Sequence, residues 1–244
     1  MQENRHRVQG LSDISAAFGA AMAMLGALDA RLLQIIGLSL QVSLAAVAVA
    51  SLIGLPLGAV VALTRFPGRA GVVAVLNGLM GLPPVVVGLV VYLLLSRAGP
   101  LGTFGLLFTP TAMVIAQTIL IAPIIAALAR QVIEDAWREY EEQLRSLRAK
   151  LPDSVWTLIW DTRFSLVTVV LAGLGRAAAE VGAVMIVGGN IDGVTRVMTT
   201  AIALETSKGD LPLALGLGIV LIAIVLLLNV AAYLVKETAQ RRYG

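Results

Sequence analysis

One segment of this chain constrains its fold more than any other: no Asp, Glu, Lys, Arg or His occurs between Arg31 and Arg65. A helix needs about 20 consecutive apolar residues to cross the hydrocarbon core of a bilayer. Residues 32–63 exceed that length, so a helix there must tilt, protrude, or bend near Gly54 and Pro56. The segment therefore predicts a membrane-spanning helix.

Composition extends this interpretation to the whole chain. Of its 244 residues, 58% are hydrophobic and only 14% are charged, whereas roughly 25% of residues are charged in soluble domains. Further apolar segments long enough to cross a bilayer are residues 71–96, 110–129, 165–187 and 211–235. We expect an all-α integral membrane protein in which residues 32–244 form a single domain with about five transmembrane helices.

The predicted spans carry helix-breaking or polar residues. Pro83 and Pro84 remove two backbone donors within the second span, and such a break is tolerated only where protein or water satisfies the freed carbonyls. Gln117 and Pro123 lie inside the third span. Spans of this kind are typical of helices that pack around a path and not of a passive membrane anchor.

Residues 1–31 form a separate N-terminal segment. Its apolar stretch, Ile14 to Leu28, is too short to span a bilayer and is followed by Asp29 and Arg31. We expect a helix that lies in the membrane interface. A signal peptide is the alternative, because the chain begins with a basic region and a short apolar region.

The distribution of Lys and Arg predicts an orientation, because these residues are retained on the cytoplasmic side of a membrane. With five spans, one side receives eleven of the 18 Lys and Arg residues and the other side six, and Arg176 is left inside a span. We therefore expect the N-terminus outside and the C-terminus in the cytoplasm. Residues 131–163 then form a cytoplasmic insert, and residues 188–210 form an external loop.

The insert is dense in charge but also periodic. Its apolar residues recur at steps of four and three, which indicates one stripe on a helix: Ile133, Trp137, Tyr140, Leu144, Leu147 and Leu151. Pro152 disfavours helix at the preceding residue and can begin a second helix, which we predict at residues 153–160. The stripe either packs on the protein's own helix ends or docks into a groove of a soluble partner.

The chain lacks the motifs of an enzyme or an ATPase. It has no G-x-x-x-x-G-K-[ST] phosphate loop, no cysteine, and a single histidine, His6, in a polar tail. The run Gly173 to Ala178 fits the dinucleotide pattern G-x-G-x-x-A but follows a membrane segment instead of a strand. We expect a transport subunit surrounded by membrane lipid and driven by an ATPase on a separate chain, with no metal site and no nucleic-acid partner.

Four segments resemble the permease subunits of bacterial and archaeal ABC importers, within the group for molybdate, sulfate and tungstate: residues 82–102, residues 116–124, the EEQLRSLRA insert and residues 175–210. The string MTTAIALETSKGD is most like tungstate permeases. The resemblance implies the type I ABC importer permease fold, a prokaryotic plasma membrane, a second copy of the chain, an ATP-binding cassette ATPase dimer that holds ATP and Mg, and an extracytoplasmic tungstate-binding protein. Molybdate and sulfate are the alternative substrates. An ion-coupled secondary transporter is disfavoured, because we detect no inverted repeats.

In similar permeases the insert is seated in the ATPase, so the resemblance implies coupling residues here. Glu142 takes the position of the family's glutamate and Leu147 that of its leucine, whereas Arg148 stands where glycine is usual. The family's usual Leu-Pro falls at Asp161-Thr162. We expect Pro152 to supply the bend that glycine normally does. The full set of expected coupling residues is Tyr140, Glu142, Leu144, Leu147, Arg148 and Pro152.

Charged and hydroxyl side chains mark an expected translocation path or gate. Arg176 and Glu180 are spaced i, i+4 on one helix face at membrane depth, where charges are costly. They form either a structural ion pair or part of the gate, and the pair is not expected to bind a dianion tightly, because Glu180 would repel it. Thr199 and Thr200 lie in the external loop. This loop is either solvated, or it partly re-enters the path and receives the binding protein.

Overall fold

The computed structural model describes residues 30–243, together with residues 18, 19, 22, 23 and 26. The described elements are α2 (Ala30–Leu63), α3 (Arg69–Leu79), α4 (Pro84–Leu95), the 3₁₀ helix η1 (Gly102–Phe104), α5 (Pro110–Ser146), α6 (Leu151–Asp161), α7 (Arg163–Ala178), α8 (Gly182–Gly188), α9 (Met198–Lys208) and α10 (Leu211–Tyr243). Most of the expected interfacial helix, residues 14–28, lies outside the described residues.

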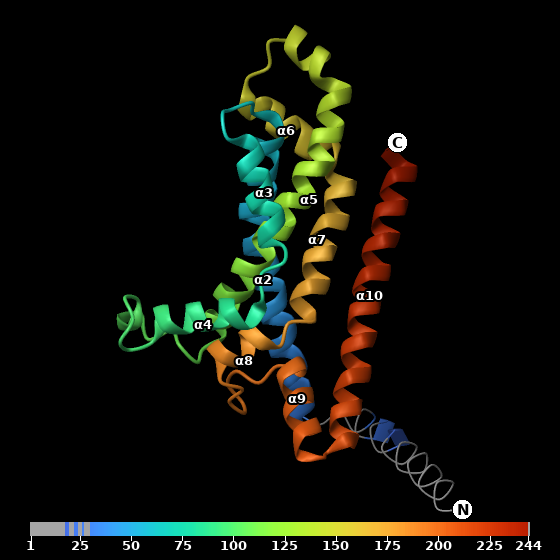
Figure 1. Cartoon of the computed structure of the whole chain (residues 1–244). Coiled ribbons are helices and arrows are strands. Elements are labelled where there is room, and N and C mark those ends of the chain that lie inside the picture. Colours follow the sequence, from blue (N-terminus) through green and yellow to red (C-terminus); the bar gives the residue numbers. More distant parts are fainter. Residues whose placement is uncertain (1–17, 20–21, 24–25, 27–29, 244) are drawn as a thin grey trace, which may run out of the picture.

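Three helices are long and apolar enough to cross a membrane: α2, α5 and residues 211–231 of α10. They confirm the first, third and fifth predicted spans. The pairs α3–α4 and α6–α7 are bent by 98° and 78°, and counting each pair as one span raises the number of possible crossings to five. Figure 1 shows the long helices running along one another. The predicted class of an all-helical membrane protein is therefore confirmed for the part of the chain that the structure describes.

The second predicted span is not a straight crossing. α3 ends at Leu79 and α4 begins at Pro84, with Pro83 in an extended conformation between them. The break follows from the proline pair as predicted, but the sharp bend was not predicted. In Figure 1, α4 projects away from the bundle. Its exposed large apolar side chains are Val85, Val86, Leu89, Val90, Leu93 and Leu94.

The prediction of one continuous helix over residues 165–187 is wrong. α7 ends at Ala178, and the chain resumes as α8 at Gly182. One contact at the break is local: the carboxylate of Glu180 accepts a hydrogen bond from the backbone N–H of Ala183 at 3.0 Å. This contact satisfies a free donor at the start of α8 and so favours a new helix over continuation of α7.

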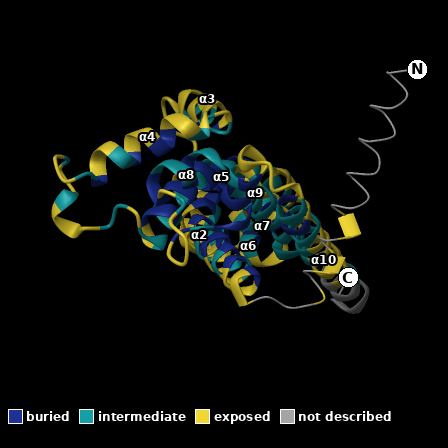
Figure 2. Ribbon diagram, turned by 90° about the horizontal axis from the view of Figure 1, so that it is seen from below, coloured by how far each residue is buried: buried dark blue, intermediate teal, exposed yellow. Residues whose placement is uncertain are grey.

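α5 lies at the centre of the core. Its most apolar window is 67% buried, against 39% for α2 and 17% for α10, and Figure 2 shows buried residues concentrated around α5 and α8. α2 approaches α5 closely at Gly58, where an added Cβ would lie only 2.5 Å from the backbone oxygen of Ala126. The G-x-x-x-G run Gly54 to Gly58 therefore serves close helix packing.

Two connecting segments differ from the sequence predictions. α5 continues beyond the third span to Ser146, and the chain turns at residues 147–150, where Arg148 adopts the left-handed conformation with φ 53°. Pro152 lies in the first turn of α6, so it begins that helix but does not make the bend. At the opposite end of the molecule (Figure 1), residues 198–208 of the expected external loop form helix α9.

Candidate functional site

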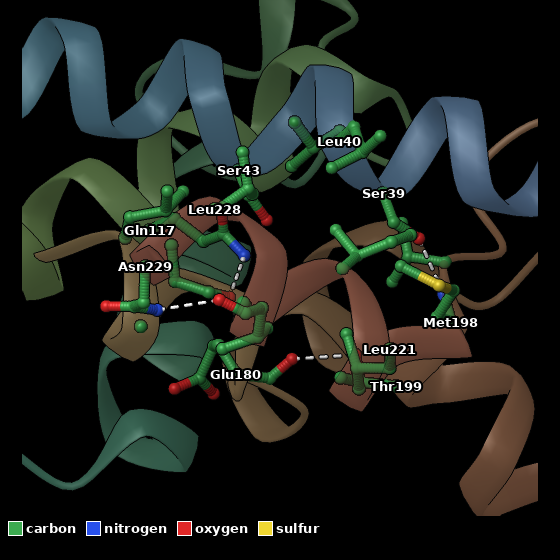
Figure 3. Close-up of a pocket in the computed structure, with 18 residues that line it drawn as sticks. Ser39, Leu40, Ser43, Gln117, Glu180, Met198, Thr199, Leu221, Leu228 and Asn229 are labelled. Atoms are coloured by element: carbon green, nitrogen blue, oxygen red, sulfur yellow. Dashed lines mark hydrogen bonds between the residues drawn. The ribbon is translucent and has the colours of Figure 1, made fainter. Parts of the chain in front are cut away.

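A buried, hydrogen-bonded polar region lies at the break between α7 and α8. Side chains from two other helices bond to its backbone (Figure 3). Gln117 of α5 donates to the carbonyl oxygen of Ala177 at 3.2 Å, and Thr199 of α9 donates to that of Glu180 at 2.8 Å. An unpaired backbone carbonyl is costly in an apolar environment. These contacts therefore stabilise a helix break inside the bundle.

Arg176 and Glu180 form an ion pair at this break. Arg176 Nη1 lies 2.7 Å from Glu180 Oε2, and Glu180 Oε1 accepts the N–H of Ala183. The side chain of Glu180 is only 3% exposed, whereas that of Arg176 is 32% exposed. Both carboxylate oxygens are thus engaged, which is the arrangement expected of a structural ion pair. A role of this pair in a gate stays a prediction.

A narrow pocket opens beside the break, between α2, α5, α7, α9 and α10 (Figure 3). Its lining is mainly apolar, and its polar side chains are Ser39, Ser43, Gln117, Glu180, Thr199 and Asn229. The cavity volume is about 30 Å³, which is on the scale of one or two water molecules. Gln117 Oε1 is buried without a partner, and Glu180 carries a negative charge. The pocket therefore suits a small hydrogen-bond donor such as water.

Thr200, in contrast, does not line this pocket. Its side chain is buried, its Oγ1 accepts the N–H of Val197 at 3.2 Å, and it donates to the carbonyl oxygen of the same residue at 3.0 Å. Nearby, Ser39 of α2 accepts the N–H of Met198 at 2.7 Å. These contacts satisfy free donors at the start of α9. They explain why this part of the expected loop is helical.

Three of the four residues predicted for a path or gate lie at the break, and their role in transport stays a prediction. Arg176, Glu180 and Thr199 meet there, although they come from separate segments. The pocket-lining polar residues that were not among the predicted site residues are Ser39, Ser43, Gln117 and Asn229. The feature of the sequence that could have indicated these residues is a hydroxyl or amide side chain in an otherwise apolar span. That signal alone does not distinguish a pocket residue from one that bonds to its own helix.

A second candidate site lies at the other end of the molecule, in the insert (residues 131–163). α6 buries Ser154 and Leu158 against the bundle and exposes Trp156 and Trp160, with 68% and 62% of each residue accessible. The guanidinium of Arg163 lies 5.0 Å from the ring centre of Trp160. Large exposed aromatic side chains are typical of contact surfaces. The outer face of α6 can therefore dock a partner.

One part of the predicted apolar stripe packs on the protein itself, and another part is free to contact a partner. Tyr140 and Leu144 are half-buried and pack on the core cluster that contains Leu158 of α6. Leu147 is 77% exposed at the end of α5. The remaining predicted coupling residues are exposed: Glu142, Arg148 and Pro152. The half-buried part of the stripe thus positions α6, and the exposed part leaves an apolar surface on the insert.

Tyr140 is also linked electrostatically to the end of α6. The negative charge of Asp161, and then that of Glu139, raises the pKa of Tyr140 above its ordinary value of 10.0. Partial burial and a hydrogen bond with Asp161 raise this pKa further. Tyr140 is therefore a neutral phenol at physiological pH and links the insert part of α5 to α6.

Arginine and glutamate pairs fasten the turn between α2 and α3 to the insert part of α5. Glu134 contacts Arg69, at 3.3 Å, and also Arg130. Glu141 contacts Arg65 at 3.4 Å. The side chain of Arg65 is 80% exposed, so its pair contributes only about 0–1 kcal/mol, whereas the pairs of Glu134 are partly buried. They hold α2, α3 and α5 together where the insert begins.

Comparison with known proteins adds a further finding. No family model matches the chain. A probable anion ABC transporter permease protein of Haloferax volcanii is 40% identical over 218 residues, which cover 87% of this chain and 94% of that protein. The tungstate uptake system permease protein TupB of Peptoclostridium acidaminophilum is 42% identical over 224 residues, which cover 92% and 98% of the two chains. The sulfate transport system permease protein CysW of Synechocystis sp. is 31% identical over 218 residues, which cover 85% and 76%.

Proposed function

We propose a substrate and a set of partners for this chain from the premise that it belongs to the family of ABC-transporter permease subunits, as relatives at 40% and 42% identity show. It is accordingly a multi-pass membrane protein. It is a transport subunit of an oxyanion importer and not an enzyme. A permease of this kind works with an ATPase and a substrate-binding partner.

The substrate that we propose is tungstate. The observation that supports it most is the match to a tungstate uptake permease, at 42% identity over 98% of that protein. The sulfate permease matches at 31% identity. Molybdate and sulfate are the alternatives, and molybdate has nearly the size and charge of tungstate. We expect the binding protein to select the anion, because an ion held strongly in the path would not leave it.

In this proposal two copies of the chain form the path, an ATPase homodimer that holds ATP and Mg drives it, and a tungstate-binding protein delivers the anion outside. The family resemblance supports a second copy of the chain. The missing phosphate loop supports an ATPase on another chain. The bias of Lys and Arg supports an orientation with the N-terminus outside and the C-terminus in the cytoplasm. The prokaryotic relatives support a prokaryotic plasma membrane.

The insert couples the chain to the ATPase in this proposal. Its support is the apolar surface made by Leu147, Trp156 and Trp160, which are all exposed. Tyr140 and Leu144 act indirectly, because they pack in the cluster that holds α6. The exposed residues that complete the proposed contact are Glu142, Arg148 and Pro152.

The break between α7 and α8 shapes the path in this proposal. Arg176, Glu180 and Thr199 supply contacts that hold it. Thr200 contributes only through the start of α9. A change at the break therefore alters the direction of α8, which lies at the end of the bundle opposite the insert (Figure 1).

Reconstitution tests the proposed function. The chain is placed in proteoliposomes with its ATPase, ATP and Mg, and the anion-loaded binding protein is added on the side opposite the ATPase. Uptake of tungstate, molybdate and sulfate is measured by elemental analysis, together with ATP hydrolysis. We expect tungstate uptake that requires all three proteins and ATP. ATP hydrolysis that is indifferent to this chain and to the binding protein would contradict the coupling, and uptake of sulfate or molybdate in place of tungstate would contradict the substrate.

A further inference from the structure

We infer that Gln117 is a positioning residue that connects the insert to the break between α7 and α8. The inference rests on the proposed function, because it concerns how a movement of the ATPase-facing insert reaches the helices inside the bundle. It gives a role to a buried amide that belongs to neither set of predicted site residues.

α5 supplies the mechanical link. It is one helix from Pro110 to Ser146, and Gln117 lies roughly 44 Å from its insert end at about 1.5 Å per residue. Near that end, the ion pairs with Arg65 and Arg69 and the apolar contacts with α6 fasten it. Pro123 lies within α5 and does not end it. A displacement of the insert is therefore carried along α5 into the bundle.

Gln117 is the residue through which α5 bonds to the backbone at the break. Its Nε2 donates to the carbonyl oxygen of Ala177 at 3.2 Å, and Gln117 is only 3% exposed. The same oxygen accepts the N–H of Glu180 at 3.2 Å, so this is the turn at which α7 ends. Gln117 Oε1 has no partner. The amide is therefore held to the break by this one hydrogen bond.

The far side of the break is held by α9 and followed by α8. Thr199 donates to the carbonyl oxygen of Glu180 at 2.8 Å. Beyond the break, α8 packs against α4 so closely that a Cβ at Gly88 would lie 2.8 Å from the Cα of Ala183. A shift of the break therefore moves α8, and α4 must follow it because there is no free space between them.

The substitution Gln117→Met removes the amide donor and keeps a side chain of similar length. In the reconstituted complex we expect the amount of tungstate imported per ATP hydrolysed to fall about tenfold, while ATP hydrolysis stays within about twofold of wild type. A tenfold change corresponds to about 1.4 kcal/mol, the usual size of one net hydrogen bond. A loss of import and hydrolysis in equal proportion would show that Gln117 only supports the fold.

Thr118→Val provides the matched control. Thr118 is the next residue on α5, and it donates to the carbonyl oxygen of Ala46 on α2 at 3.5 Å, away from the break. This variant also loses one hydrogen bond from α5, but we expect its import per ATP to stay within about twofold of wild type. The inference is overturned if Gln117→Met leaves the ratio unchanged or if both variants lower it equally.

Thr199 variants keep the test decisive if Gln117→Met fails to assemble. Thr199→Val removes the donor to Glu180 and is expected to lower import per ATP, whereas Thr199→Ser keeps the hydroxyl and restores the ratio. An unchanged ratio in Thr199→Val overturns the inference. A wild-type complex that imports no tungstate contradicts the proposed substrate instead, and the same ratio is then measured with the anion that is imported.

Discussion

Replacing Arg176 and Glu180 singly and together tests the physical account of the helix break. Arg176→Leu leaves the carboxylate of Glu180, which is 3% exposed, with the N–H of Ala183 as its remaining donor. We expect a loss of about 3–5 kcal/mol in the free energy of unfolding, because a buried charge loses its partner. In Glu180→Leu the unpaired Arg176 is less costly, because 32% of its side chain is exposed. Its main cost is then the unpaired N–H of Ala183, at about 1–3 kcal/mol.

The double substitution separates the pair from its surroundings. With both charges removed, no buried carboxylate is left without a partner, so the cost is expected to approach that of Glu180→Leu alone. The double variant should therefore lose about 3–5 kcal/mol less than the sum of the two single losses, which is the whole cost of Arg176→Leu. Arg176 and Glu180 are in direct contact at 2.7 Å, which is where such non-additivity is expected.

The assay is unfolding of the purified chain in detergent, followed by tungstate import of the same variants in proteoliposomes. Additive losses in the cycle would refute the ion pair as a stabilising contact. A stable double variant that imports at the wild-type rate would establish a structural role alone. A stable double variant that no longer imports would instead establish that the pair takes part in the gate.

Three further predictions concern packing, docking and titration. Gly58→Leu is expected to destabilise the chain by about 1–3 kcal/mol or more, because its Cβ meets a backbone oxygen of α5 at 2.5 Å. The loss is measured as a lower thermal midpoint, and Gly71→Leu, which has open space around its Cβ, is the control. Trp156→Ser is expected to reduce co-purification of the ATPase while the thermal midpoint stays unchanged, because this side chain is 68% exposed. Asp161→Asn is expected to lower the pKa of Tyr140 towards 10.0, measured by absorbance at alkaline pH against Tyr140→Phe. Since this pKa is raised in the folded chain, stability falls as the pH rises from 10.0 towards the raised pKa, and an unchanged titration would contradict the contact with Asp161.

The crossing helices could be predicted from the sequence because the membrane leaves few alternatives. A long segment without charge has no water to satisfy its backbone, so it must form its hydrogen bonds internally as a helix. Residues 32–63 and 211–235 follow this rule, and α2 and α10 lie there. The break at Pro83 was also predictable, since a residue without an N–H cannot continue a helix ladder.

The break at Glu180 could not be predicted in the same way. Neither proline nor a polar cluster interrupts the apolar run there, and Arg176 and Glu180 at i, i+4 even favour a continuous helix. The break depends on donors from distant segments, namely Gln117 on α5 and Thr199 on α9. Contacts of this kind arise only once the helices are packed. The pocket residues were missed for the same reason.

The turn in the insert shows how a regular pattern can mislead. The steps of four and three continue through Leu147 and Leu151, yet α5 ends at Ser146 and both leucines are exposed. Arg148 adopts the left-handed conformation that glycine takes without strain, so the bend occurs at this position without a replacement hinge. Pro152 fits the first turn of α6, where its missing N–H costs nothing.

The polar pocket beside the break does not suit an oxyanion, for two independent reasons. Ser39, Gln117, Thr199 and Asn229 each donate to a backbone oxygen, and Glu180 adds a negative charge. Its volume of about 30 Å³ is on the scale of one or two water molecules. An importer does not need a tight anion-binding site here, because a tightly bound ion would not leave the path. The contacts that disfavour an anion here are the contacts that hold α7 and α8 at their angle, so the geometry favours a site that shapes the helices over one that binds the anion.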